Sequence, residues 1–252
     1  DAFGFNVNLI HNRYGSVHPP GCTIVCCFID KNSFTRFNNL FILLIGIHVS
    51  FRKGWFFYLC CSFKNSRKQL MYTLNCKGRL LVLEKPIVMG ILNITPDSFY
   101  TGSRVETETT ILQKAVQMLD EGAAILDIGG QSTRPGSNRI SADEESERVL
   151  PAIQLIKQQF PHCFISIDTY HASVAKQAVK AGADIINDIS AGAMDEAMLA
   201  TAASLQVPYI AMHMKGTPDT MQNNPSYENV TREVLDYFIK KTEECKAAGI
   251  KD

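Results

Sequence analysis

The sequence lacks several patterns that would place it in a well-marked class of protein. Its 252 residues carry no formal net charge, which gives no indication of nucleic acid or a membrane surface as partner. No GxGxxG or GxxxxGK[ST] loop follows an apolar run, and this disfavours the nucleotide-binding sheets. No CxxC pair suggests a zinc site. What remains is a chain long enough for one large domain with a substantial core.

Glutamate is missing from residues 1–70, which differ from the rest of the chain in other ways too. This part carries a charge of about +6 and the remainder about −6, and it holds ten of the fourteen Phe residues. We expect residues 1–70 to be an unassigned hydrophobic and basic extension, for instance translated upstream sequence, and residues 71–252 to form the folded domain. A hydrophobic anchor is the alternative, although Arg52 and Lys53 interrupt the apolar stretch at 40–63.

The cysteines give no disulfide framework. Five of the eight lie in residues 1–70, and the other three, Cys76, Cys163 and Cys245, are widely separated. Scattered thiols of this kind are typical of a reducing compartment, so we expect a cytoplasmic protein with no membrane partner.

From residue 85 onward, short apolar runs alternate with longer amphipathic segments, the pattern of βα units around a parallel sheet. The expected strands are 87–92, 124–128, 164–167, 184–187 and 207–212. The expected helices are 106–121, one that begins at a Ser141–Glu144 capping box, 172–181, 195–204, and one that starts near 230 and ends before Gly249.

Two of these helices have a face that we expect to be buried. In the first helix it consists of Leu112, Ala115, Val116 and Leu119. In the last helix it consists of Val230, Val234, Phe238 and Cys245, with Leu235 and Ile239 beside them. Repeated βα units fit a doubly wound sheet or an eight-stranded barrel, and the missing phosphate loop favours the second. We therefore predict an α/β fold, a TIM (β/α)8 barrel that is incomplete here, with about five of its eight units.

Polar residues stand where each expected strand ends. They are Asn93, Asp127 with Gly129 and Gly130, Asp168, Asn187 with Asp188, and His213. In a barrel, the chemistry gathers at the carboxyl ends of the strands. This ring of polar groups is therefore the first indication of a functional site.

Each of these groups also has an ordinary structural interpretation. Asp168 could accept two hydrogen bonds from a flat, guanidine-like ligand edge, or cap the following helix. Asn187 could read a heterocycle whose edge alternates donors and acceptors, or satisfy loop backbone. Asn93 could offer an oxygen to Mg²⁺, although the spacing alone is weak evidence. His213 is more readily explained as a packed side chain than as an acid–base group.

The loop at 129–137, GGQSTRPGS, suggests an anion site. Its glycines allow close backbone approach, Ser132 and Thr133 supply hydroxyls, and Arg134 brings a permanent positive charge. A generic polar loop is the alternative.

Five segments in this order resemble the dihydropteroate synthase family. They are LNITPDSF at 92–99, DIGGQSTRPG at 127–136, SIDT at 166–169, INDI at 186–189 and MHMKG at 212–216. The resemblance implies a TIM-barrel transferase of folate biosynthesis, which uses Mg²⁺ to join p-aminobenzoate to a dihydropterin methyl diphosphate and releases diphosphate. A pterin-dependent methyltransferase and a non-catalytic pterin-binding fragment are the alternatives.

The resemblance also implies roles for individual residues. Asn93, Thr133 and Arg134 would be catalytic, with Asn93 also holding Mg²⁺. The pterin would be bound by Asp168, Asn187, Ile189, Ile210 and Met212. The p-aminobenzoate site would be shaped by Phe99, Arg134 and Pro135. The partners would be these small molecules and, in the full-length protein, a second copy of the chain in a homodimer.

The sequence departs from the family pattern in two places. Thr101 stands where many members have Asp, so a carboxylate that would stabilise positive charge from that loop is missing. The family's sixth, seventh and eighth strands should follow Asp252. We expect this polypeptide alone to be inactive and the full gene product to be a synthase, since an open barrel exposes sheet edges and interior.

Overall fold

Five parallel strands in chain order form the centre of the molecule. The computed structural model describes residues 45–51, 54–60, 71–95, 104–131, 139–217, 220–221 and 225–252. The parallel strands are β5 (Ile87–Asn93), β6 (Ala123–Gly129), β7 (Phe164–Asp168), β8 (Ile185–Asp188) and β9 (Tyr209–Ala211), each hydrogen-bonded to the next. This order never reverses, as it would in a doubly wound sheet, and it is the order of one arc of a barrel.

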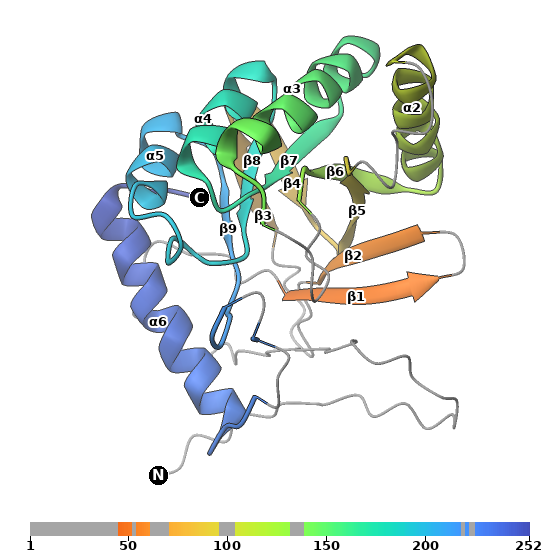
Figure 1. The fold of residues 1–252 in the computed structure, drawn as a ribbon. Coiled ribbons are helices and arrows are strands. Elements are labelled where there is room, and N and C mark those ends of the chain that lie inside the picture. Colours follow the sequence, from red (N-terminus) through yellow and green to blue (C-terminus); the bar gives the residue numbers. More distant parts are fainter. Residues whose placement is uncertain are drawn as a thin grey trace.

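Helices follow these strands and cover one side of them. They are α2 (Arg104–Asp120), α3 (Ala142–Gln159), α4 (Ala172–Ala181), α5 (Met198–Leu205) and α6 (Val230–Ala248). Figure 1 shows α2 to α5 as an arc along the strands, with α6 beyond α5. The expected caps are present: the Ser141 hydroxyl accepts from the Glu144 amide at 3.2 Å, and α4 and α6 end at Gly182 and Gly249.

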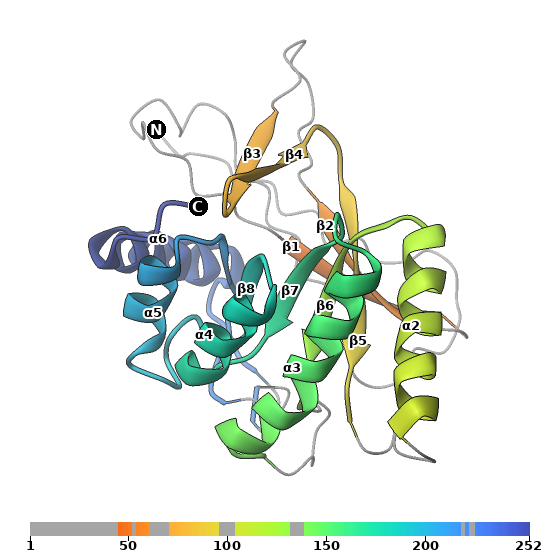
Figure 2. The same cartoon turned by 90° about the horizontal axis from the view of Figure 1, so that it is seen from above.

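A hairpin that the sequence analysis did not predict precedes β5. It consists of β3 (Tyr72–Cys76) and β4 (Arg79–Leu83), joined through Lys77 and Gly78, which both have positive φ. Its buried side chains are Leu74, Cys76, Leu81 and Leu83, and they share one cluster with Met89, Ile125, Ile185 and Ile210 of the parallel strands. The hairpin therefore covers the amino ends of the strands, at one end of the sheet (Figure 2).

Two further strands lie within residues 1–70. β1 (Ile45–Phe51) and β2 (Gly54–Cys60) are antiparallel, and residues 56–59 of β2 pair with residues 87–90 of β5. The division of the chain at residue 70 stays a prediction, and the pairing of β2 with β5 runs across it. No helix among the described residues is long and apolar enough to cross a membrane.

Successive side chains of each strand point alternately to the helices and to the interior of the arc. Leu126 and Ile128 of β6 point to the helices and belong to the main core. Ile125 lies on the opposite face, in the cluster beneath the hairpin. Because successive side chains alternate, Asp127 and Gly129 continue the face of Ile125 toward the carboxyl end. The same interior face is thus apolar at its amino end and polar at its carboxyl end.

Some sequence-based expectations of helix packing are wrong. Val116 of α2 and Val230 and Ile239 of α6 are exposed, because the buried stripe of each helix is narrower than the apolar pattern suggested. On α6 the fully buried residues, Val234 and Cys245, lie three turns apart on one line.

Helix α5 also begins later than expected, at Met198 instead of residue 195. Asp195 lies before the helix, where its carboxylate accepts from the amide of Ala172 at 2.7 Å and from the amide of Ala197 at 3.0 Å. Asp195 thus stabilises the start of α4, the preceding helix, as well as its own turn.

Candidate functional site

The predicted site residues of four strands fall on one row of the sheet. Asn93 pairs with Gly129, Gly129 with Asp168, Asp168 with Asn187, and Asn187 with Ile210. Paired residues on neighbouring strands point to the same face, so this row brings together side chains that are distant in the chain.

Gly129 lets two of these side chains approach each other. A Cβ atom at this position would lie 3.0 Å from Asn93 Oδ1 and 3.5 Å from Asp168 Oδ2. The oxygens of Asn93 and Asp168 therefore both lie next to a backbone position that has no side chain of its own. This confirms that the two predicted residues are neighbours, and it gives the glycine a steric role.

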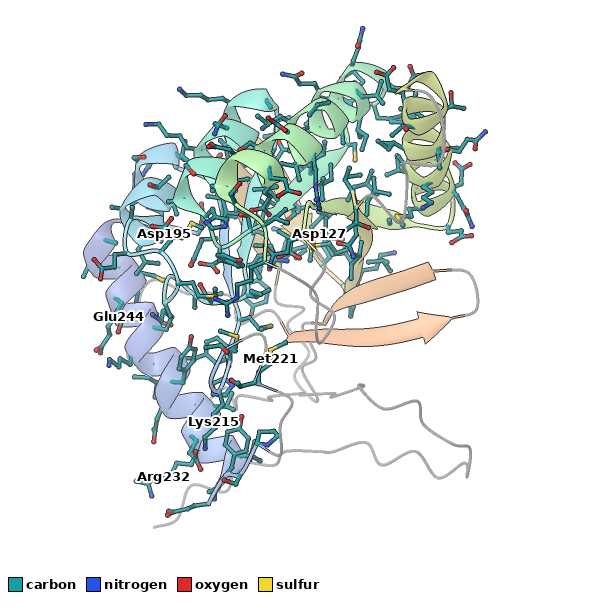
Figure 3. The ribbon with its side chains drawn as sticks, viewed as in Figure 1. Asp127, Asp195, Lys215, Met221, Arg232 and Glu244 are labelled. Carbon is teal, nitrogen blue, oxygen red and sulfur yellow. The ribbon has the colours of Figure 1, made fainter. Side chains whose placement is uncertain are left out.

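Asn187 is held from below by Asp127, a residue to which the sequence analysis gave no role. The Asn187 Nδ2 donates to Asp127 Oδ2 at 3.1 Å, and the two side chains are buried. Figure 3 shows Asp127 among the strands, while Arg232 and Glu244 lie on the outer helix α6. Burial raises the pKa of Asp127 to about 6, and the neighbouring Ser166 hydroxyl and Asn187 amide oppose the shift.

Asp168 lies in an acidic environment. Burial raises its pKa well above the ordinary value, and the negative charges of Asp127, Glu145 and Asp188 raise it further. A site whose own carboxylates repel one another favours a ligand that brings hydrogen-bond donors or positive charge. Asp168 does not cap the next helix, because His171 occupies the N-cap position of α4.

Glu145 is a further buried acid, and the sequence analysis did not single it out. It lies in the first turn of α3 and is only 1% exposed. Its Oε2 accepts from the Thr169 hydroxyl at 2.9 Å, next to Asp168 in the chain. Burial raises the pKa of Glu145 to about 7, and Thr169 and Arg148 oppose the shift. Its spacing of four residues from Val149, on the apolar face of α3, was the available sequence signal.

The root of the 129–137 loop rests on this part of α3. A Cβ atom on Gly130 would lie 2.9 Å from Glu145 Cγ and 2.9 Å from Val149 Cγ1. Arg148 Nη1 donates to the carbonyl of Gly130 at 2.9 Å, and the Tyr170 hydroxyl donates to Gln131 Oε1 at 3.0 Å. Helix α3 and the residues after β7 thus fix where the loop begins.

Asp188 points away from the row and organises the loop after β8. It accepts hydrogen bonds at 2.7–2.8 Å from the Ser190 amide and hydroxyl, the Gly192 amide and the Tyr209 hydroxyl. The half-buried Ile189 lies within this loop, beside Asn187 in the chain. Asp188 thereby holds the backbone that follows Asn187 in one conformation.

The remaining predicted pterin-binding residues are on β9 or just after it. Ile210 is buried and lies in the cluster that contacts the hairpin. The backbone of Met212 is fixed at both ends, since its amide donates to the Asp188 carbonyl at 3.3 Å and its carbonyl accepts from the Tyr237 hydroxyl at 3.2 Å. His213 packs edge-on against the Tyr237 ring, with centroids 4.8 Å apart, and burial lowers its pKa. This supports a packing role for His213.

Other predicted site residues lie outside the described ranges. They are Phe99, Thr133, Arg134 and Pro135, and Thr101, where the sequence departs from the family pattern, lies outside these ranges too. Their roles stay predictions. Among the described residues, no group of three or more His, Cys, Asp and Glu side chains could hold a metal ion. The oxygen atoms that Asn93 and Asp168 place over Gly129 are hard donors, which suit Mg²⁺ when water and phosphate complete its shell.

Comparison with known proteins gives consistent results. The dihydropteroate synthase of Haemophilus influenzae is 44% identical over 178 residues, which are 71% of this chain and 64% of the relative. A crystal structure of the Yersinia pestis dihydropteroate synthase with a sulfonamide drug complex matches with a TM-score of 0.64 at 41% identity, covering 71% of this chain and 64% of that one. The Xanthomonas albilineans dihydropteroate synthase with 4-aminobenzoic acid matches with a TM-score of 0.62 at 38% identity, covering 72% and 63%.

The chain spans less than two thirds of the length of the curated relatives it matches. A family model described as pterin binding enzyme matches residues 89–252, which contain the whole row from Asn93 to Ile210. The chain belongs to the pterin-binding enzyme family.

Proposed function

We propose that the protein is a dihydropteroate synthase, a transferase that condenses p-aminobenzoate with 6-hydroxymethyl-7,8-dihydropterin diphosphate to give dihydropteroate and diphosphate. The observation that carries this proposal is the row in which Asn93, Asp168 and Asn187 are neighbours at the carboxyl ends of the strands. Similarity to enzymes of this name, one of them in complex with 4-aminobenzoic acid, supports it.

Asp168 and Asn187 suit the edge of a pterin ring. The 2-amino group and the neighbouring ring nitrogen form a guanidine-like edge with two donors, which one carboxylate can accept together. Asn187 adds an amide that has both a donor and an acceptor. The acids near Asp168 favour such a donor-rich ligand. In this proposal Ile189, Ile210 and Met212 supply the apolar surface beside the ring.

Asn93 is proposed to lie next to the diphosphate end of the substrate. Its Oδ1, which lies with an oxygen of Asp168 beside Gly129, would hold Mg²⁺ together with substrate oxygens. A bound Mg²⁺ would neutralise charge on the departing diphosphate. Thr133 and Arg134 would contact the substrates from the 129–137 loop, with Pro135 and Phe99 beside the p-aminobenzoate, as expected from the sequence.

The reaction then needs mainly orientation. The bond between the pterin methylene carbon and the diphosphate oxygen breaks, leaving positive charge on the pterin and negative charge on the diphosphate. The aryl amine of p-aminobenzoate forms a bond to the methylene carbon and loses one proton to solvent. The protein's part is to hold the pterin by Asp168 and Asn187 while the amine approaches.

Two further features belong to this proposal. The unpaired thiols of Cys76, Cys163 and Cys245 support a cytoplasmic location. The homodimer of the full-length protein stays a prediction.

The test is turnover by this chain when it is joined to the part of a relative that it does not span. Residues 71–252 would be joined to the part of the Haemophilus influenzae synthase that lies beyond the match, and diphosphate release and dihydropteroate formation would be measured. We expect product only with both substrates present, and none from an Asp168→Asn version. A protein that instead transfers a methyl group from a methylated pterin, and leaves p-aminobenzoate unchanged, would overturn the proposal.

A further inference from the structure

We propose that Asp127 is a positioning residue that fixes the orientation of the Asn187 carboxamide, and thereby decides which hydrogen-bond pattern the heterocycle must present. This inference rests on the proposed function, because it assigns Asn187 to the pterin ring. Asp127 lies beneath the row of ligand-facing side chains. It does not contact the ligand itself and acts on it only by orienting Asn187.

The contact that carries the inference joins two buried side chains from strands far apart in the chain. Asn187 Nδ2 donates to Asp127 Oδ2 at 3.1 Å, across a separation of 60 residues. Asp127 is 2% exposed and Asn187 is 9% exposed. A side-chain hydrogen bond at this depth has little competition from water, so it holds the amide in place.

The chemistry of the two groups makes this contact directional. An ionised carboxylate only accepts hydrogen bonds, whereas a carboxamide has a donor side and an acceptor side. Asp127 can therefore pair only with the nitrogen of Asn187, and the amide oxygen and the second N–H are left in fixed positions for a ligand. Without the carboxylate, rotation of the amide by half a turn would exchange donor and acceptor with little cost.

Around Asp127, some buried polar atoms lack a hydrogen-bond partner among the described residues. Asp127 Oδ1 and the hydroxyl of Ser166 are buried, and neither makes a hydrogen bond of good geometry within that part of the chain, although the hydroxyl lies close enough to Asp127 to lower its pKa. Asp127 and Ser166 are paired residues on β6 and β7. Buried polar atoms without partners are rare in a purely structural core, and here they lie directly under the row of Asn93, Asp168 and Asn187.

A structural role for Asp127 and a positioning role predict different results. If Asp127 only stabilises the fold, its replacement weakens the binding of every ligand by the same factor. If Asp127 orients Asn187, its replacement changes the ratio between ligands whose edges carry opposite patterns. Pterin and 2,4-diaminopteridine form such a pair, because the second has an amine where the first has a carbonyl and lacks the adjacent ring N–H.

The experiment compares these two ligands by calorimetry on the full chain at pH 8, where Asp127 is ionised. We expect the unmodified chain to prefer pterin, and Asp127→Asn, which keeps the shape but offers both a donor and an acceptor, to reduce that preference at least tenfold. The matched control is Asp195→Asn, the same change at an acid that accepts from the amides of Ala172 and Ala197 outside the row, and it should leave the preference within threefold. An equal loss for both ligands in Asp127→Asn would overturn the inference.

A ligand-free measurement keeps the inference testable if Asp127→Asn does not fold. In the unmodified chain, NMR should show contacts from the side-chain NH₂ protons of Asn187 to the β-protons of Asp127, with slowed exchange of those protons. Their absence would overturn the inference. Failure of the unmodified chain to bind either ligand would count against the proposed function, while the NMR contacts would still decide the orientation of Asn187.

Discussion

Two buried acids at opposite ends of the same strands differ in how far their oxygens are hydrogen-bonded. At the amino end, Asp184 accepts from Arg79 at 2.8 Å, from Lys157 at 2.6 Å and from the amide of Ile165 at 2.9 Å. At the carboxyl end, Asp127 keeps one buried oxygen without a partner, and burial raises the pKa of both Asp127 and Asp168. Within the described residues, protein groups thus satisfy both oxygens of Asp184, and those of Asp188 on the helix side of the carboxyl end, but only one oxygen of Asp127 on the interior face.

The difference separates stability from function. Arg79 links the β3–β4 hairpin to Asp184 and to the carbonyls of His162 and Cys163, so charges at this end hold elements together. At the other end, Asp168 lies near the carboxylates of Asp127, Glu145 and Asp188, and a ligand with hydrogen-bond donors would be favoured there. A barrel is expected to divide its ends in this way, with structure at the amino side and chemistry at the carboxyl side.

The largest effect should come from removing the saturated acid. Asp184→Ala removes the buried carboxylate between Arg79 and Lys157 and leaves these two cations with backbone carbonyls alone. We expect a loss of about 3–5 kcal/mol in the free energy of unfolding. Urea denaturation measures it. The control is Lys240→Ala, which removes an exposed pair with Glu244 (3.9 Å) and should cost less than about 1 kcal/mol. Equal losses in the two variants would remove the contrast between the ends.

Replacing Glu145 should have the opposite effect and stabilise the protein, because the ionised form of this buried side chain destabilises the folded state. Its pKa is about 7 in the folded state, against 4.5 for an ordinary Glu. The stability tied to its protonated form is complete below pH 4.5 and is lost as the pH rises through about 7. Glu145→Gln should therefore match the unmodified chain at pH 4 and exceed it by about 3 kcal/mol at pH 8.

Thermal unfolding at the two pH values measures this difference. The neighbouring Glu144→Gln is the control, because Glu144 is about half exposed and pairs with Arg148 at the surface. It should change stability little at either pH. If Glu145→Gln showed no gain at pH 8, Glu145 would not be a destabilising buried acid.

A smaller effect is expected where Asn93 and Asp168 meet. Gly129→Ala places a Cβ 3.0 Å from Asn93 Oδ1, and we expect a cost of about 2 kcal/mol together with weaker pterin binding. Gly90→Ala is the matched control, because its Cβ would lie 3.0 Å from the flexible Met118 Sδ, away from the site. It should lower stability without changing pterin affinity, and a change in affinity there would contradict the placement of the site.

Local signals in the sequence predicted most of the central fold. The Ser141 cap, the glycines at 182 and 249 and the apolar runs of the strands depend on residues a few positions apart, and the structure confirms them. The β3–β4 hairpin escaped prediction because its turn uses Lys77 at positive φ, a conformation rare outside Gly and Asn.

The site was predictable only in part, for a different reason. Strand ends and family motifs indicated Asn93, Asp168 and Asn187, which the structure places in one row. The roles of the other two acids depend on distant partners. Asp127 bonds Asn187, 60 residues away, and Glu145 bonds Thr169, 24 residues away. Such contacts depend on strand register and helix packing, which no local pattern specifies.

The most direct test of the account is whether Asp168 binds a pterin. Calorimetry would compare the binding of pterin by the full chain and by Asp168→Asn, which keeps the size of the side chain and removes its charge. Loss of charge-assisted hydrogen bonds should weaken binding by at least about 1.5 kcal/mol, roughly tenfold. Equal affinity in the two proteins would contradict the assignment of the carboxyl end of the strands as a pterin site.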